Sequence, residues 1–193
     1  MMQRRRRALL ALTVLVIGAT IWFLADEKED VRTAPAPSTP SEFIDYAVQP
    51  AQEGMAEYDV PASVSLAQAI VESNWAQSEL TIKGLNYFGI KCAGESPYAT
   101  GCLERATQEC DADGNCAETI AEFRTYASAE DSFRDHGHFL TTNPRYENAF
   151  NHVDDPDQFA KTIAEAGYAT DPEYADKLIE LMQQYDLYKY NDI

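Results

Sequence analysis

An uncharged apolar segment near the start of the sequence restricts how this chain can be organised. Residues 8–25 contain no charged side chain and are rich in Leu, Val and Ile, and four consecutive arginines at residues 4–7 precede them. At about 1.5 Å per residue, a helix of this length spans roughly 27 Å, close to the thickness of a bilayer core. The segment therefore predicts a membrane helix, and only the residues after it are left to form a folded domain.

Two interpretations of this segment compete, a cleaved signal peptide and an uncleaved signal-anchor. The run is long for a signal peptide, and its end, from Trp22 to Ala25, lacks the small residues of a cleavage site, which favours the anchor. The arginines predict a cytoplasmic N-terminus. We expect a single-pass protein of the cytoplasmic membrane, whose domain faces the periplasm or the extracellular side. Its parts would be a basic tail (1–7), a transmembrane signal-anchor (8–25), a Pro-rich linker (26–41) and one folded domain (42–193).

The charge distribution argues against nucleic acid as a partner. The chain has 15 Lys and Arg against 32 Asp and Glu, a formal net charge of −17. Because the four arginines precede all of the acidic residues, the part after residue 25 is more acidic still. Binding to phosphates requires a basic face, so we expect no nucleic-acid partner.

All four cysteines fall in one short stretch, Cys92, Cys102, Cys110 and Cys116. In an exported domain, an even and clustered set of cysteines predicts two disulfides, for which three pairings exist. We expect Cys92–Cys102 and Cys110–Cys116, since each closes a short loop. The alternative is a zinc site, but no Cys-x-x-Cys spacing supports it.

Helix signals occur at both ends of the domain. Apolar spacing, prolines at first turns and capping residues predict six helices. They run from Ser41 to Val48, from Pro50 to about Tyr58, from Pro61 to about Glu72, from Ser128 to about Leu140, from Pro156 to before Gly167, and from Pro172 to about Tyr185.

The stretch between these helices differs in character. Residues 84–126 contain Gly, Cys and aromatic residues but little helical periodicity, and residues 111–115 (Asp-Ala-Asp-Gly-Asn) form a strong turn signal. This pattern predicts a β-hairpin with a disulfide near its tip. The expected fold class is α+β, mainly α.

Two patterns resemble metal sites. Four side chains match positions one, three, five and twelve of a calcium-binding loop: Asp111, Asp113, Asn115 and Glu122. Position six, however, is Cys116 rather than Gly, and no helix precedes the loop, so a turn is the better interpretation. His136 and His138 lie two apart on a predicted helix and thus on different faces. We expect no metal and no cofactor.

Glu72 is the carboxylate of greatest interest in the sequence. It lies at the end of an otherwise apolar predicted helix, where the helix dipole is negative, and Trp75 follows it. Both surroundings raise the pKa of a carboxyl group, and a raised pKa is what a general acid needs near neutral pH. The alternative is an ordinary solvated Glu at a helix end.

Residues 66–75 (Leu-Ala-Gln-Ala-Ile-Val-Glu-Ser-Asn-Trp) resemble the catalytic-helix motif of the endo-β-N-acetylglucosaminidases of glycoside hydrolase family 73. This family includes the peptidoglycan-cleaving domain of flagellar rod assembly proteins and many autolysins. Further blocks resemble the family in the same order, at residues 86–91, 123–128, 143–146 and 167–178. The resemblance implies a lysozyme-like helical domain with a small β-hairpin insertion.

The resemblance also implies roles for individual residues. Glu72 matches the family's general acid, Glu109 resembles its second carboxylate in the β insertion, and Tyr168 matches a tyrosine important for activity. The residues that we expect to contact the sugar are Trp75, Asn86, Phe88 and Tyr126, although core packing is the stronger expectation for Phe88. The sequence departs from the family pattern at Ala76, where Gly is usual, at Tyr87, where Leu is common, and at Cys110, where Tyr is usual.

The function that the resemblance implies is cleavage of peptidoglycan, at the β-1,4 bond between N-acetylglucosamine and N-acetylmuramic acid. Glycoside hydrolysis needs an acid at the leaving oxygen and a base or nucleophile near the anomeric carbon, and the substrate's own acetamido group could replace the second carboxylate. Two alternatives remain: a muramidase or lytic transglycosylase of related fold, and an inactive scaffold that binds the cell wall.

Overall fold

Helix α2 (Ala62–Ser73) forms the centre of the fold. The computed structural model describes residues 37–110 and 116–192, without the side chains of residues 108–110 and 116. Ten of the 12 residues of α2 are buried, so this helix is covered on nearly all sides, as expected of a helix with one charged residue and otherwise apolar or uncharged polar ones. It contacts α1 (Pro40–Tyr58), α5 (Pro156–Glu165) and α6 (Tyr174–Gln184).

Helix α1 corrects the prediction of two short helices divided at Pro50. It is one helix of 19 residues, and Thr39 rather than Ser41 caps it, its side chain accepting the N–H of Glu42 at 3.2 Å. Proline inside a helix removes one backbone hydrogen bond and crowds the preceding turn. Here Pro50 is buried and α1 packs along α4 (Ala129–Thr142). Burial of both halves against a neighbouring helix therefore outweighs the local signal for a break.

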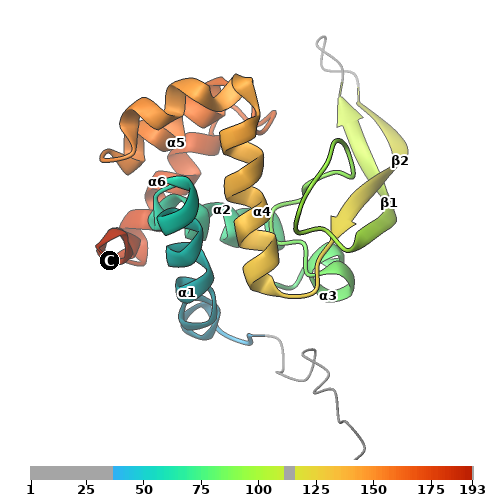
Figure 1. Cartoon of the computed structure of the whole chain (residues 1–193), viewed down its shortest axis with the longest axis horizontal. Coiled ribbons are helices and arrows are strands. Elements are labelled where there is room, and N and C mark those ends of the chain that lie inside the picture. The colour runs from blue at the N-terminus through green and yellow to red at the C-terminus, as the bar shows by residue number, and fades with distance from the viewer. Residues whose placement is uncertain (1–36, 111–115, 193) are drawn as a thin grey trace, which may run out of the picture. The chain divides into compact units, whose positions relative to one another are not determined.

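The two strands form the predicted antiparallel hairpin. β1 (Gly101–Cys110) pairs with β2 (Cys116–Thr125) in a register that sets Cys102 opposite Arg124. The short helix α3 (Glu79–Gly84), which was not predicted, contacts both strands. The predicted turn, residues 111–115, lies outside the described residues. In Figure 1 the hairpin lies on one side of α4, while α1, α5 and α6 lie on the other.

The predicted disulfide between Cys92 and Cys102 is confirmed, with Cα atoms 6.0 Å apart. It joins the segment before the hairpin to the start of β1, and the Cys92 N–H donates to the carbonyl of Glu122 in β2 at 2.8 Å. For the second predicted pair, the backbones of Cys110 and Cys116 are register partners, but their side chains lie outside the described residues. The Cys110–Cys116 disulfide therefore stays a prediction.

Replacing Cys92 and Cys102 together with Ser should lower the free energy of unfolding by about 2–3 kcal/mol, because the unfolded chain loses the constraint of a closed loop. Urea denaturation of the oxidised protein and of the double variant would measure this difference. Equal midpoints and slopes for the two proteins would show that this bond contributes nothing to stability.

The C-terminal half contains the other predicted helices. Ser128 caps α4 by accepting the N–H of Asp131 at 3.2 Å, and Pro156 opens α5, both as predicted. α6 begins at Tyr174, two residues after the predicted start, because the Asp171 side chain accepts the N–H of Glu173 and forms a turn first. Two 3-10 helices were not predicted: η1 (Pro144–His152) and η2 (Leu187–Asn191).

The predicted N-terminal anchor, residues 8–25, lies outside the described residues. Among residues 37–110 and 116–192, no helix has both the length and the apolar character needed to cross a membrane. The described helices begin at Pro40, so α1 starts within the last two residues of the stretch predicted as linker.

Candidate active site

Glu72 lies in the last turn of α2 and is the one charged residue of that helix. It is half-buried, and its Oε1 accepts a hydrogen bond from the Tyr174 hydroxyl of α6 at 2.7 Å. α2 and α6 pack directly against each other, which is why a tyrosine from the C-terminal part of the chain reaches this carboxyl. The arrangement holds one oxygen of Glu72 in a fixed direction.

Burial governs the electrostatics of Glu72. It raises the pKa of the carboxyl above its usual value, and the hydrogen bond from Tyr174 opposes this effect in part. The pKa of the Tyr174 hydroxyl is raised too, first by burial and then by the charges of Tyr168 and Glu72. Glu72 therefore keeps a proton to higher pH than an exposed glutamate does, as a general acid must.

A left-handed turn follows α2 directly after Ser73, the residue next to Glu72. Asn74, Trp75 and Ala76 have φ angles of 49°, 58° and 63°, in the left-handed region that residues other than Gly rarely adopt. Ser73 stabilises this turn, because its hydroxyl donates to the Ala69 carbonyl at 2.5 Å and accepts the Ala76 N–H at 2.8 Å. Ala76, which the family pattern has as Gly, thus adopts the conformation that Gly would favour.

Tyr168 packs on the tyrosine that bonds Glu72, so two of the predicted catalytic residues, Glu72 and Tyr168, have Tyr174 as a common neighbour. Its ring stacks on Tyr174, with centroids 5.7 Å apart and an interplanar angle of 16°. Burial, followed by the negative charge of Glu72, raises the pKa of the Tyr168 hydroxyl well above its usual value. Gly167, at φ +80°, provides the left-handed turn that leads from α5 into Tyr168.

The third predicted catalytic residue, Glu109, lies on the hairpin. Its backbone is in β1, opposite Ala117 of β2, near the end of the strands that is farther from the Cys92–Cys102 disulfide. The Glu109 side chain lies outside the described residues. Its approach to Glu72 stays a prediction.

Asn86, predicted to contact the sugar, is buried and uses all of its hydrogen-bonding groups within the protein. Its Nδ2 donates to the carbonyls of Ile90 and Arg124, and its Oδ1 accepts the N–H groups of Phe88 and Ile90, at 2.9–3.3 Å. The side chain therefore shapes the loop from residue 86 to residue 90 and ties it to β2. A direct contact with substrate stays a prediction.

Phe88 and Tyr126, two further predicted contacts, are buried as well. The Phe88 ring stacks on His136 at 4.0 Å between centroids, as the expectation of core packing required. The Tyr126 hydroxyl donates to Asp135 Oδ2 at 2.6 Å. Both side chains make their contacts inside the protein, and their contact with a sugar stays a prediction.

Asp135 of α4 is the centre of a buried polar network at the base of the hairpin. Its carboxylate accepts hydrogen bonds from Tyr126, from Ser96 Oγ at 2.6 Å and from Arg124 Nη1 at 2.8 Å. The Arg124 side chain is 5% exposed and that of Asp135 is 0% exposed. Arg124 also donates to the Ala93 carbonyl at 2.7 Å. The network fixes β2, and the segment before β1, to the helical part.

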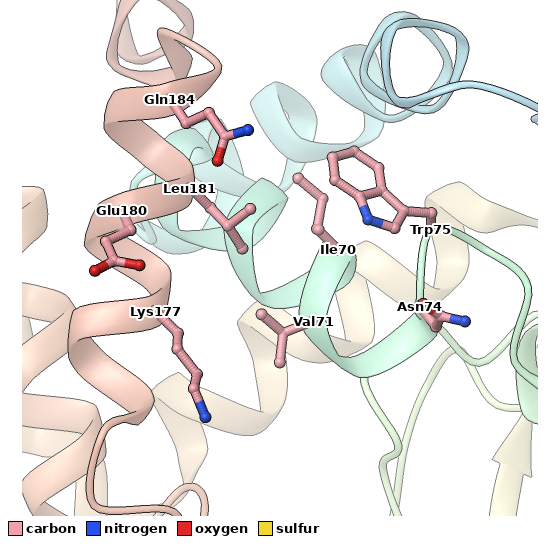
Figure 2. Close-up of a pocket in the computed structure, with 8 residues that line it drawn as sticks. All are labelled: Ile70, Val71, Asn74, Trp75, Lys177, Glu180, Leu181 and Gln184. Carbon is pink, nitrogen blue, oxygen red and sulfur yellow. The ribbon is translucent and has the colours of Figure 1, made fainter.

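Trp75 forms part of the wall of a pocket of about 340 Å³ between α2 and α6. Figure 2 shows its indole beside Ile70 on one wall, and Lys177, Glu180 and Gln184 on the α6 wall. The Trp75 ring makes edge contacts with Phe43 at 5.7 Å and Tyr185 at 5.1 Å, which fix its orientation. Of the four predicted sugar contacts, Asn86, Phe88 and Tyr126 are buried, while Trp75 is half-buried and lines this pocket.

The sequence did not predict three residues that are linked to Glu72 by hydrogen bonds, either directly or through one another: Tyr174, Gln68 and His136. In the sequence, Gln68 and Tyr174 lie within the family-like blocks at residues 66–75 and 167–178, without a role of their own, and His136 was considered only as a metal ligand. Gln68 and Glu72 are four residues apart on one helix face, and this spacing is the signal that could have linked them. In the structure Gln68 bonds Tyr174 on one side and His136 on the other.

Comparison with known proteins identifies relatives of this chain. The chain is 35% identical over 152 residues to the peptidoglycan hydrolase FlgJ of Pseudomonas aeruginosa, covering 77% of this chain and 37% of FlgJ. It is 32% identical over 155 residues to the exo-glucosaminidase LytG of Bacillus subtilis, covering 78% of this chain and 53% of LytG. The chain thus spans about half of these relatives, or less.

The solved structures agree with this likeness. The catalytic domain of the autolysin Auto from Listeria monocytogenes superposes with a TM-score of 0.69 at 29% identity, covering 81% of this chain and 90% of that domain. The mainly helical α+β fold with one hairpin is therefore the lysozyme-like fold that the sequence predicted. A family model described as glucosaminidase (mannosyl-glycoprotein endo-beta-N-acetylglucosaminidase) matches residues 48–187, and on this match the chain belongs to the glucosaminidase family.

Proposed function

We propose that this protein hydrolyses peptidoglycan, cutting the β-1,4 bond between N-acetylglucosamine and N-acetylmuramic acid. The family supports a glucosaminidase activity, and the Pseudomonas aeruginosa relative FlgJ is named a peptidoglycan hydrolase. The observation that carries the proposal is the carboxyl of Glu72, half-buried at the end of the central helix and held by Tyr174.

In the proposed reaction, Glu72 is the general acid. Burial keeps the carboxyl protonated at a pH where an exposed glutamate is ionised, so that it can give its proton to the leaving glycosidic oxygen. Tyr168 would contact the sugar at the point of cleavage. Glu109 on the hairpin would act at the anomeric carbon, and the substrate's acetamido group is the alternative for this second role.

Replacing Glu109 with Gln should lower the turnover number about tenfold or more if this residue acts at the anomeric carbon, because an amide is neither base nor nucleophile. Glu104, Glu118 and Glu122 are matched controls on the same two strands, and their Gln variants should keep near-normal turnover. Loss of activity in one of the controls instead would show that the second carboxylate is misassigned. Full activity in all four variants would favour the acetamido-assisted route.

Mass spectrometry of digested peptidoglycan, after borohydride reduction, tests the proposed bond specificity. A glucosaminidase leaves reduced glucosamine at the new ends, whereas a muramidase leaves reduced muramic acid. A lytic transglycosylase leaves an anhydro end that borohydride does not reduce, and an inactive scaffold leaves no product. Because LytG is named an exo-glucosaminidase, fragment lengths at early times should be recorded as well. Long fragments would indicate cleavage within strands, and disaccharides would indicate cleavage from their ends.

For the location of the enzyme, we propose a single-pass anchor in the cytoplasmic membrane formed by residues 8–25, with the domain on the outer side. The uncharged apolar run and the arginines before it support this proposal. An anchored chain should stay in the membrane pellet after extraction with alkaline carbonate. Complete release into the supernatant would contradict the anchor.

A further inference from the structure

Three buried side chains form a continuous line of hydrogen bonds that ends at Glu72. His136 Nε2 of α4 lies 3.0 Å from Gln68 Oε1 of α2. Gln68 Nε2 donates to the Tyr174 hydroxyl at 3.0 Å, and that hydroxyl donates to Glu72 Oε1 at 2.7 Å. His136 and Gln68 are wholly buried and Tyr174 is 3% exposed, so water does not compete for the two bonds that Gln68 makes.

The direction of this line follows from the state of His136. Burial lowers the pKa of its imidazole to about 3, so the ring is neutral and one nitrogen carries the hydrogen. Nδ1 is buried and has no partner among the described residues. A buried N–H without an acceptor is rarer and less favourable than a bare ring nitrogen. The hydrogen therefore belongs on Nε2, which donates to Gln68.

The remaining bonds then have one possible direction. The Gln68 carbonyl accepts from His136, so its NH₂ group faces Tyr174 and occupies a lone pair of the hydroxyl oxygen. The Tyr174 hydrogen is thereby directed at Glu72. If the Gln68 amide were turned around, its carbonyl would compete with Glu72 for that hydrogen. Hydrogen bonds aligned in one direction also polarise and strengthen one another.

We infer that His136, Gln68 and Tyr174 form a relay that positions Glu72 for catalysis by fixing which of its oxygens carries the transferable proton. Because Oε1 accepts from Tyr174, the proton of the acid form resides on Oε2, and Oε2 is the oxygen that donates to the substrate. This inference rests on the proposed role of Glu72 as the general acid. The relay residues act through Glu72 and are positioning residues.

The packing around the relay is consistent with such a role. The His136 ring is stacked on Phe88 and the Tyr174 ring is stacked on Tyr168, so stacking fixes the orientation of both rings. The titratable groups that face Glu72 among the described residues are the hydroxyls of Tyr174 from α6 and Tyr168 from the segment before it. Neither is a cation. The hydrogen bond from Tyr174 is therefore the contact that favours the ionised form of Glu72.

The pH profile of the Tyr174→Phe variant, measured on the full chain with soluble glycan strands, tests the relay. This variant keeps the stacked ring and removes only the donor to Glu72. We expect the turnover number to fall about tenfold with little change in KM, because the proton is no longer confined to Oε2. The alkaline limb of kcat/KM should move up by about one pH unit, because loss of the bond raises the pKa of Glu72.

Tyr188→Phe is the matched control, because the Tyr188 hydroxyl also donates to a carboxylate, Asp157 Oδ1, at 2.6 Å, outside the relay. Its alkaline limb should match that of the wild type. An unshifted limb in Tyr174→Phe, or an equal shift in the control, would overturn the inference.

A pair of variants at His136 tests the far end of the relay. Gln places an amide nitrogen the same number of bonds from Cα as Nε2, so His136→Gln should keep most of the activity and the wild-type limb. His136→Met has similar volume but no donor, and should show the upward shift of Tyr174→Phe. Equal behaviour of the two His136 variants would remove His136 from the relay.

Glu72→Gln separates failure of the relay from failure of the proposed function. If Glu72→Gln is inactive while Tyr174→Phe has a wild-type profile, the relay is wrong and the general acid stands. If Glu72→Gln keeps its activity, the assignment of the acid is wrong, and the relay has no catalytic purpose.

Discussion

Replacing Glu72 with Gln should lower the rate of glycan hydrolysis by roughly 10²-fold or more, because the amide has the shape of the carboxyl but no transferable proton. The substitution keeps an oxygen that can accept the Tyr174 hydroxyl, so the surrounding contacts stay in place. Release of reducing ends from purified peptidoglycan would measure the loss. Near-normal turnover would remove Glu72 from the mechanism.

The same variant has a predicted effect on stability, and its sign follows from the pKa of Glu72. Burial raises the pKa of this carboxyl in the folded protein above the value of 4.5. Its contribution is therefore fully present below the unfolded pKa and is lost as the pH rises through the folded pKa. Above that pH the ionised carboxyl destabilises the fold. Glu72→Gln should unfold at a higher urea concentration than the wild type at neutral pH, with a smaller difference near pH 4.

Glu165→Gln provides a matched control for both measurements. Glu165, like Glu72, is a carboxylate in the last turn of a helix, here α5, but it is exposed. Its replacement should change neither turnover nor the pH dependence of unfolding by a measurable amount. If Glu165→Gln lost activity as Glu72→Gln does, a helix-end charge rather than a positioned acid would explain the effect.

Asp135→Ala should lower the free energy of unfolding by about 3–5 kcal/mol, because it leaves the Arg124 guanidinium buried without its counter-charge. The hydroxyls of Tyr126 and Ser96 lose their acceptor at the same time. A loss of this size is a large part of the stability of a typical domain. Chemical denaturation followed by circular dichroism would measure it.

The exposed ion pair of Arg134 and Glu57 is the control for this prediction. It has similar geometry, with Nε to Oε2 at 2.7 Å, but its side chains are 39% and 38% exposed. Glu57→Ala should therefore lower the free energy of unfolding by about 1 kcal/mol or less. Equal losses for Glu57→Ala and Asp135→Ala would show that burial does not determine the strength of the Asp135 network.

Local signals in the sequence predicted those parts of the fold in which a few neighbouring residues decide the conformation. The Ser128 cap, the proline that opens α5, the hairpin and the Cys92–Cys102 disulfide are of this kind. Pro50 shows the limit of such signals. Proline breaks an isolated helix, but packing along α4 keeps α1 continuous. The residues adjacent to Pro50 do not predict this packing.

For the candidate site, too, the sequence predicted individual residues but not the contacts between distant parts of the chain. Glu72 and Tyr168 were singled out by their motifs, and both contact Tyr174 in the structure. The relay behind Glu72 was not predicted, because Gln68, His136 and Tyr174 come from three helices and meet only once these helices pack. Asn86 and Tyr126 were expected at the sugar, yet their polar groups bond within the protein, as the polar groups of buried residues generally do.

The hairpin is fixed to the helical part near the start of β1, so residues farther along the strand lie on a long arm. The fixed point is where the disulfide and the Arg124–Asp135 ion pair lie, near the Cys102–Arg124 register pair. Glu109 lies seven residues further along β1, an arm of about 23 Å at roughly 3.3 Å per residue. If the hairpin rotated by about 10° around this fixed point, the backbone of Glu109 would move through roughly 4 Å, more than the length of a hydrogen bond. If Glu109 acts at the anomeric carbon as proposed, a substitution at Asp135 should therefore lower turnover as well as stability, because Asp135 and Arg124 fix the base of the arm that carries Glu109.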